Sequence, residues 1–529
     1  MNGKTYTLFT LLVLFACSLN AQPVKFNADF ESGALGSYEL IDSVWFKHST
    51  QDSTLMLSYD IYSRFDPENP TDKALPPSGR WFYFQLTGVK DKQLYLTFHN
   101  TDPLRCMYSY DNETFERLHP CDAPARRKVA AQFERDTVYM AYYTPYTFTY
   151  LQKRLADWQA KNPETVKLET IGQSTQGRPM QLLTITDPTA DNSGKKRIWI
   201  QGRIHTSETS ASWHLDGFID GILADTPEAE AIRKSIIFHI NPYVNPDGVY
   251  HGLSRSNTNG VNLEINWNRP EEQTEQEVKV LKAKMAELIK KDGAFDMYLG
   301  MHSQVANRAT YWIHKADSTN ERFFQREMLL TYLTCATSRD YLIKEDLDFS
   351  NVAPRYPEGW IWNQSGDTTL AITFETPYTY YSNRPDKPWV TNENLRDFGV
   401  TTLTSVSDFF GVSSPNRIII DNTNAKMSGK WNHFRTADIV YYGEDCVMPQ
   451  QANNKITYRA NNVAAGSYKV YCWHPGPVDN DAETNTWLYL QEYQQKKDGK
   501  LSLKLNAGST HFSNGKAKLY DAILLVRTK

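Results

Sequence analysis

The sequence predicts an α/β domain with a mixed central sheet flanked by helices, set between an N-terminal and a C-terminal β-sandwich. Its 529 residues exceed the ~250–300 at which a single hydrophobic core stops growing, so several domains are expected. The middle of the chain alternates strand and helix patterns, whereas both ends run in short strand-like segments separated by turns. We therefore expect domains at residues 22–144, 145–411 and 416–529.

The first 21 residues have the pattern of a secretory signal. A lysine near the start precedes an apolar run at residues 8–17, and small or polar residues follow. Cleavage after Ala21 would make this a secreted or periplasmic bacterial protein. Residues 14–17 also resemble a lipoprotein box, so the alternative is a lipid anchor on Cys17. No later segment reaches ~18 uninterrupted apolar residues, and no transmembrane helix is predicted.

The secondary structure of each part follows from its hydrophobic period. Strands are predicted throughout residues 24–138 and again after the linker at 411–416. Thr274 with Glu277 has the spacing of a capping box and predicts a helix start. The expected middle elements are helices at 150–161, 210–223, 275–291 and 395–410, and strands at 180–186, 197–205, 235–241, 295–302 and 370–375.

Charge and cysteine content exclude two classes of site. The net charge of −4 lacks the basic excess of a nucleic-acid-binding protein, so no nucleic-acid partner is expected. Cys106 with Cys121, or Cys446 with Cys472, could form a disulfide in an oxidising compartment. No CxxC spacing occurs, which argues against a zinc site built on thiolates.

Two predicted strand ends carry residues that bind zinc in other proteins. His205 ends the strand at 197–205, Glu208 comes three residues later, and His302 ends the strand at 295–302. Ligands in open α/β sheets bind at the carboxyl ends of strands, and two histidines with one glutamate leave the open position of a catalytic zinc site. An HxxE spacing alone is usually a solvated helix start; the third ligand makes the prediction of one bound Zn²⁺ specific.

A carboxylate at a third strand end fits the role of a general base. Glu375 ends the apolar strand at 370–375 and should emerge beside the other strand ends. Zinc lowers the pKa of a bound water to about 7, but another group must still carry the proton to the leaving amine. We therefore predict that Glu375 is catalytic.

The order of motifs resembles the zinc carboxypeptidases related to carboxypeptidase A, and in particular their cytosolic-carboxypeptidase-like branch. The resemblance is strong over residues 145–410, and residues 22–144 are similar to the β-sandwich that precedes the catalytic domain in that branch. Residues 416–529 look like a golvesin-type β-sandwich. The motifs lie at residues 171–174 with 177–179, 205–208, 245–248, 301–303 and 373–375.

This resemblance implies further roles. Arg255 matches the arginine that polarises the scissile carbonyl and stabilises the oxyanion. Asn262 lies where the family often has a carboxylate that orients the first zinc histidine, and its amide oxygen can accept the same hydrogen bond.

The sequence departs from the family in the loop that holds the terminal carboxylate of the substrate. Glu264 and Ile265 stand where the family pattern reads Asn-Arg. Isoleucine offers no hydrogen bond to a carboxylate and glutamate repels it. Arg269 is a possible replacement; alternatively Glu264 receives a cationic or amine-bearing group. Tyr356, Trp360 and Ile361 are the candidate lining of the side-chain pocket, which would be apolar or stacking.

The predicted function is hydrolysis of a peptide bond by a secreted metallocarboxypeptidase. The missing carboxylate clamp leaves a first alternative, an endopeptidase or amidase acting on peptidoglycan stems or modified peptides. A second alternative is a non-catalytic protein that binds a glycan or peptide. The expected partners are a peptide or peptidoglycan-like substrate and, through the β-sandwiches, glycan or cell-wall material.

Overall fold

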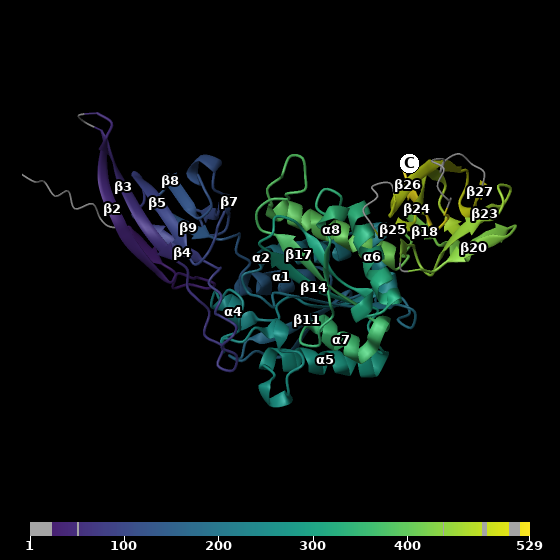
Figure 1. The fold of residues 1–529 in the computed structure, drawn as a ribbon, viewed down its shortest axis with the longest axis horizontal. Coiled ribbons are helices and arrows are strands. Elements are labelled where there is room, and N and C mark those ends of the chain that lie inside the picture. Colours follow the sequence, from purple (N-terminus) through teal and green to yellow (C-terminus); the bar gives the residue numbers. More distant parts are fainter. Residues whose placement is uncertain (1–23, 50–51, 437, 479–483, 507–518, 529) are drawn as a thin grey trace, which may run out of the picture.

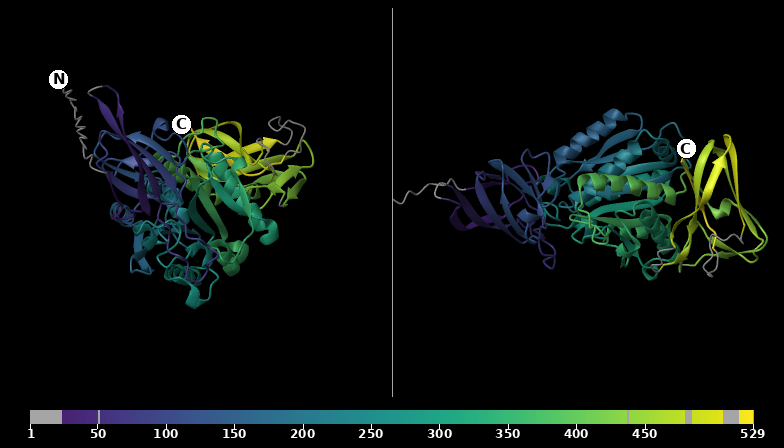
Figure 2. Two further views of the ribbon diagram at one scale, coloured as in Figure 1. Left: turned by 60° about the vertical axis from the view of Figure 1, so that its left-hand side comes forward. Right: turned by 90° about the horizontal axis from the view of Figure 1, so that it is seen from above.

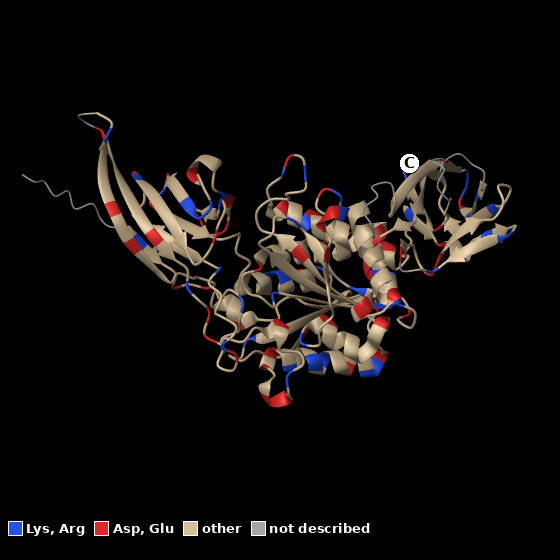
Figure 3. Cartoon of the chain, viewed as in Figure 1, with Lys and Arg blue, Asp and Glu red and all other residues tan. Residues whose placement is uncertain are grey.

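Three parts follow one another along the long axis of the molecule (Figures 1 and 2). The computed structural model describes residues 24–49, 52–436, 438–478, 484–506 and 519–528. The predicted signal and Cys17 lie outside these residues. Among the described helices, none has the length and hydropathy that a bilayer span requires. Lysine, arginine, aspartate and glutamate are interspersed over all three parts (Figure 3).

The N-terminal part consists of two β-sheets packed on a shared apolar core. Inward and outward side chains alternate along its strands, as in residues 53–62, where every second residue is buried. One sheet has the order β1 (Lys25–Asn27), β4 (Tyr83–Thr87), β9 (Thr137–Ala141), β6 (Met107–Ser109), β7 (Glu116–Arg117). The other has the order β2 (Ser37–Lys47), β3 (Ser53–Tyr62), β5 (Lys92–His99), β8 (Lys128–Gln132).

A mixed sheet forms the centre of the molecule, as predicted, and it contains eight strands, of which β10, β15 and β16 were not predicted. Its inner strands are buried on both faces and therefore read as almost continuous apolar runs. The order is β10 (Val166–Gln173), β11 (Pro179–Ile185), β13 (Ile236–Asn241), β12 (Lys196–Gly202), β14 (Met297–Gln304), β17 (Leu370–Pro377), β15 (Thr310–His314), β16 (Asp348–Ser350).

Helices cover both faces of this sheet, with α2 and α8 on one side and α5 and α7 on the other (Figure 1). The helices are α1 (Phe148–Lys161), α2 (Thr209–Leu223), α3 (Pro227–Ser235), α4 (Pro246–Tyr250), α5 (Gln276–Asp292), α6 (Glu321–Thr337), α7 (Pro357–Ser365) and α8 (Asn392–Phe409). Gly217 and Gly399 let α2 and α8 approach closely, since a Cβ on Gly217 would lie 2.1 Å from the Arg396 carbonyl oxygen.

The strand register brings the predicted site residues to one edge of the sheet. Strands β12, β14 and β17 run parallel as neighbours, with Gly202 opposite Met301 and His302 opposite Glu375. The carboxyl ends of these strands therefore meet, and the loop that leaves β12 carries His205 to the same edge.

The C-terminal part is β-rich and has a core of its own, formed by residues such as Tyr458, Tyr468 and Ile523. Its sheets are β18–β28–β24–β26, β19–β23–β27, β20–β22 and β21–β25. It packs against α6 and α8 through Arg417, which binds the buried Asp408 carboxylate, and Gln325, which donates to the Tyr441 carbonyl. The strands are β18 (Arg417–Ile420), β19 (Lys426–Ser428), β20 (Trp431–Phe434), β21 (Ile439–Val440), β22 (Cys446–Pro449), β23 (Lys455–Val463), β24 (Gly466–His474), β25 (Gly476–Pro477), β26 (Thr486–Gln495), β27 (Gly499–Asn506) and β28 (Ile523–Arg527).

The predicted capping box is wrong. Helix α5 is capped by Glu275, without a side-chain hydrogen bond. The Thr274 hydroxyl instead donates to the carbonyls of Arg269 and Pro270, and the Glu277 carboxylate accepts from the Thr175 amide at 2.9 Å. A local contact thus takes the Thr274 side chain, and a tertiary contact the Glu277 side chain, away from the helix end.

Neither predicted disulfide is formed. Cys106, Cys446 and Cys472 are buried free thiols, whereas Cys121 is exposed. The different burial of Cys106 and Cys121 separates the first pair, and desolvation raises the pKa of Cys106 to about 12. Cys446 and Cys472 sit on strands β22 and β24 of different sheets.

Candidate active site

Three buried side chains from two strand ends form the centre of the site. His205 lies in the loop after β12, Glu208 stands at the N-terminus of α2, and His302 lies on β14. The exposed fraction of each of these residues is 4% or less. Burying two imidazoles and a carboxylate together is costly unless they bind one another or a metal ion.

Glu208 bridges the Nδ1 edges of the two histidines. Its Oε1 lies 2.8 Å from His205 Nδ1, and its Oε2 lies 3.0 Å from His302 Nδ1. Burial alone would raise the pKa of Glu208, but the two imidazoles hold it well below its usual range. Burial would lower the pKa of His302, yet the carboxylates of Glu208 and Glu264 raise it to about 10. The ionised Glu208 carboxylate thus lies between two imidazoles whose Nδ1 atoms can carry protons. A divalent cation could replace these protons.

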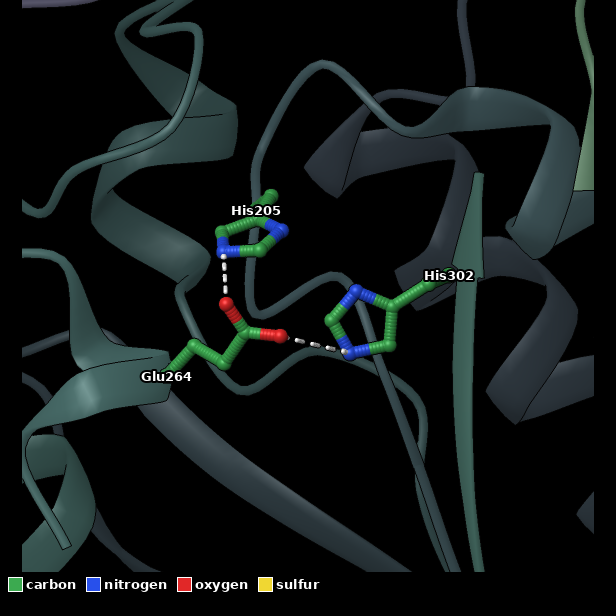
Figure 4. Close-up of side chains that lie close together, drawn as sticks. All are labelled: His205, Glu264 and His302. Atoms are coloured by element: carbon green, nitrogen blue, oxygen red, sulfur yellow. Dashed lines mark ion pairs between the residues drawn. The ribbon is translucent and has the colours of Figure 1, made fainter. Parts of the chain in front are cut away.

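Glu264 lies at the opposite edge of the same imidazoles (Figure 4). One oxygen is 3.2 Å from His205 Nε2 and the other is 3.9 Å from His302 Nε2. His205, Glu264 and His302 offer ligand atoms that all lie within 4.8 Å of one another. Although burial opposes it, His205 and other cationic groups hold the pKa of Glu264 at about 2. The two histidines are therefore flanked by two ionised carboxylates, either of which could complete a metal site.

The Nδ1 edge fits a zinc ion better. Asn262 Oδ1 lies 3.2 Å from His205 Nε2 and can accept a hydrogen bond from the Nε2–H group, which leaves the Nδ1 lone pair free for a metal. Glu264 is already paired with Arg255 Nη2 at 3.0 Å. Glu208 is nearly equidistant from the two Nδ1 atoms and also accepts from the Ser303 amide at 3.2 Å, which fixes its orientation.

Glu375 lies beside this centre with one oxygen available. Its Oε1 accepts from Trp312 Nε1 at 3.3 Å, while its Oε2 is buried and has no hydrogen-bond partner among the described residues. Burial, together with the charge of Glu208, raises the pKa of Glu375 to about 7. A carboxylate with such a pKa is suited to taking up and releasing a proton near neutral pH.

The loop between α4 and α5 carries the remaining predicted residues. The Arg255 side chain reaches the site and binds Glu264. Ile265 is half-buried in the short 3₁₀ turn Leu263–Ile265 and carries no polar atom on its side chain. Arg269 is exposed, and within the described ranges its side chain makes no hydrogen bond or ion pair. The structure thus brings Arg255 and Glu264 to the centre but leaves Arg269 outside it.

The N-terminal part fixes this loop through Asp66, which the sequence analysis did not single out. Its carboxylate accepts from the backbone amides of Ser254, Arg255 and Ser256 at 2.6, 2.7 and 2.9 Å. The Trp81 amide also donates to Ser254 Oγ at 2.9 Å. A buried carboxylate from the N-terminal part therefore holds the backbone that carries Arg255.

Replacing Asp66 by alanine is expected to lower kcat/KM by roughly 10- to 100-fold, because the Arg255 backbone loses its support and a small misplacement of a catalytic group is costly. Three buried amides would lose their acceptor, so the free energy of unfolding should fall by about 3 kcal/mol or more. Steady-state kinetics and urea unfolding measure the two effects. Glu68→Gln, an exposed residue of the same segment, is the matched control. Wild-type kcat/KM in Asp66→Ala would contradict this role.

The predicted pocket segment also contains a buried charged residue, Glu358, that the sequence analysis did not single out. Tyr356 is half-buried, and its hydroxyl binds the Arg355 guanidinium at 3.1 Å. The Trp360 ring lies 5.6 Å from the Trp267 ring, and Ile361 is packed in the core. The carboxylate of Glu358 is buried and close enough to His302 and Glu264 to interact with their charges. The sequence feature that could have indicated this residue is a charged glutamate within a segment rich in aromatic residues.

Comparison with known proteins agrees with this geometry. Residues 151–328 match the zinc carboxypeptidase domain family. Cytosolic carboxypeptidase 6 of Mus musculus is 31% identical over 397 residues, which cover 68% of this chain and 69% of the mouse protein. The chain belongs to the zinc carboxypeptidase family. Cytosolic carboxypeptidase 6 of Homo sapiens is 30% identical over 395 residues, 68% of this chain and 74% of the human protein.

Solved structures show that this zinc carboxypeptidase shares the fold of bacterial metallo-carboxypeptidases. The enzyme from Burkholderia cenocepacia superposes with a TM-score of 0.58 at 23% identity, over 73% of this chain and 100% of the other. The enzyme from Pseudomonas aeruginosa gives a TM-score of 0.57 at 20% identity, over 73% and 99%. The protein is thus a hydrolase of the metallocarboxypeptidase type, and zinc is the cofactor of its family.

Proposed function

We propose that this carboxypeptidase hydrolyses peptide bonds with one zinc ion held by His205 Nδ1, His302 Nδ1 and the Glu208 carboxylate. The observation that carries the proposal is the buried Glu208 bridge, with distances of 2.8 and 3.0 Å to the two Nδ1 atoms. Two imidazoles and one carboxylate are the protein ligands of many catalytic zinc sites. Asn262 orients His205 from the far side of its ring.

Zinc bound here would supply an acidified water and a Lewis acid for the scissile carbonyl. Glu375 accepts the proton of the attacking water on its unpartnered Oε2 and delivers it to the leaving amine. Arg255 exchanges its ion pair with Glu264 for the carbonyl oxygen of the substrate, where negative charge develops. Asp66 and the Ser254–Ser256 backbone keep Arg255 in place during this exchange.

The position of the cleaved bond is the open part of this proposal. Ile265 and Glu264 supply no donor to a terminal carboxylate, and Arg269 is exposed away from the described contacts of the site. These features favour, as a second candidate, an endopeptidase or amidase that acts on peptidoglycan stems or modified peptides. A non-catalytic role is disfavoured because all the groups required for hydrolysis lie together.

Matched peptides with a free and an amidated C-terminus separate the two candidates. A carboxypeptidase is expected to release the last residue of the free peptide and to leave the amidated one intact, because recognition of a carboxylate requires its charge. Mass spectrometry of the products identifies the bond. Equal cleavage of both peptides would contradict strict carboxypeptidase action, and internal cleavage would establish the second candidate.

We further propose that the protein acts outside the cytoplasm, on the basis of the signal pattern at residues 1–21. We also propose domain boundaries at 22–144, 145–411 and 416–529. The C-terminal β-sandwich resembles golvesin domains, and contact with glycan or cell-wall material remains a proposal for it. It is attached to α6 and α8 rather than to the loop that carries Arg255.

A further inference from the structure

A second layer of side chains lies directly beneath the proposed active site. Gly300 and Thr373 are paired in register on β14 and β17, two residues before His302 and Glu375. Residues two apart on a strand point to the same face, so Gly300 and Thr373 form the next level of the sheet surface below the site. Tyr298 precedes Gly300 by two residues and lies on the same face. These three residues therefore lie on the same face of the sheet as His302 and Glu375, further from the strand ends.

Three polar groups converge at the space left by Gly300. A Cβ at this glycine would lie 3.0 Å from Thr373 Oγ1, 3.3 Å from Tyr298 Oη and 3.5 Å from Glu358 Oε1. The Thr373 hydroxyl donates to the Glu358 carboxylate. The Tyr298 hydroxyl is fully buried and has no hydrogen-bond partner in the part of the chain that the structure describes. Since buried hydroxyls are nearly always paired, this group points to a missing ligand.

The charge of Glu358 is not matched by its neighbours. His314, the nearest base, already binds the Glu327 carboxylate at 2.8 Å, so that pair adds little net charge. Glu264 adds a further negative charge from the level of the active site, and His302 is shared with Glu208. Burial raises the pKa of Glu358, and an incoming cation would offset this cost of desolvation.

We propose that Glu358, with Tyr298 and Thr373, forms a subsite for a cationic substrate side chain, an amine or guanidinium of the lysine or arginine kind. This inference rests on the proposed peptidase function and names its preferred substrate. A buried carboxylate beside two hydroxyl oxygens offers several acceptors to one donor-rich group, and charge-assisted hydrogen bonds of this kind are strong. Gly300 is required because any side chain there would occupy the same space. An acidic side chain would be repelled by Glu358 and Glu264.

Four peptides that differ only in the residue next to the scissile bond test this subsite: lysine, arginine, norleucine and glutamate. The assays use zinc-loaded full-length protein. The C-terminus of the peptides is free or amidated, whichever the wild type cleaves. We expect kcat/KM for lysine to exceed that for norleucine by about 30-fold or more, because norleucine has the same shape without the amine. Glutamate should be the poorest of the four. The ratio for arginine decides whether the subsite prefers an amine or a guanidinium.

In Glu358→Gln the ratio of lysine to norleucine is expected to fall towards one. In Tyr298→Phe, which keeps the ring, it should fall several-fold. Glu321→Gln, an exposed residue at the start of α6, is the matched control and should keep the wild-type ratio. Thermal melts of all variants report folding. If Glu358→Gln does not fold, Tyr298→Phe and the wild-type ratio still decide the question.

The outcomes separate this inference from the proposed function. A wild-type protein that hydrolyses the peptides with a ratio of one or less, or a Glu358→Gln variant that folds and keeps the wild-type ratio, overturns the cationic subsite and leaves hydrolysis standing. A preference for norleucine would mean that the subsite accepts apolar side chains. Water, and not a substrate cation, would then bind Glu358, Tyr298 and Thr373. A wild-type protein that cleaves none of the peptides when loaded with zinc overturns the peptidase function itself.

Discussion

Replacing Glu375 by glutamine is expected to lower kcat by about 10²–10⁴-fold, the usual contribution of a general acid–base group. Glutamine keeps the size of the side chain and can still bind Trp312, but it cannot take a proton from water. The Oε2 atom that is now buried without a partner in the described chain is the atom that should receive this proton. Zinc content should stay at the wild-type value, because Glu375 is not a proposed ligand.

Steady-state kinetics and zinc analysis of the same preparation measure the two quantities together. Glu393→Gln, an exposed position at the start of α8, is the matched control and should retain wild-type kcat. Full activity in Glu375→Gln would remove Glu375 from the mechanism. Loss of zinc together with activity would instead make it a ligand or a support of one.

The second large effect is expected at Glu208. In Glu208→Gln zinc affinity should fall by more than the roughly 10–100-fold that loss of an outer partner costs, because a charged ligand disappears between two imidazoles. In Glu264→Gln zinc affinity should change much less, since this carboxylate faces the Nε2 edge and binds Arg255. Competition titration with a chromophoric chelator gives both dissociation constants.

The paired variants also decide which edge of the histidines holds the metal. The ligand atoms of His205, Glu264 and His302 are also close enough to bind one metal ion. Glu264 is therefore the alternative to Glu208 as the carboxylate ligand. A larger loss of affinity in Glu264→Gln than in Glu208→Gln would place the ion at the Nε2 edge and contradict the proposed ligand set. Melting temperatures of the two zinc-free variants serve as the folding control.

The main helices and strands of the central part could be predicted because each shows its own spacing of apolar residues, which is visible within the segment itself. The apolar runs that end at His302 and Glu375 are buried parallel strands, and such strands have few other interpretations. Because these strands run parallel as neighbours, their carboxyl ends meet and bring His205, His302 and Glu375 together; the strand order itself comes from the structure. The helices α3, α4, α6 and α7 were not predicted; α6 and α7 have weak amphipathic patterns because they are buried on several sides.

The features that escaped prediction depend on contacts distant in sequence in the case of Asp66 and Glu358, and on local competition for a hydroxyl in the case of Thr274. Asp66 binds amides almost two hundred residues away, and a turn-rich aspartate in a β-domain carries no sign of this. Thr274 has the right spacing for a capping box, but nearby carbonyls compete successfully for its hydroxyl. Glu358 lies in a segment that reads as apolar, and only the register of Gly300 and Thr373 makes its inward position visible.

Zinc titration of metal-free protein tests the account most directly. Protein stripped with a chelator is given increasing zinc, and peptide hydrolysis is followed by mass spectrometry. The account predicts no product without metal, activity that rises in proportion to added zinc, and a plateau at one equivalent per chain. Hydrolysis that is independent of zinc, or no hydrolysis at any ratio, would contradict it.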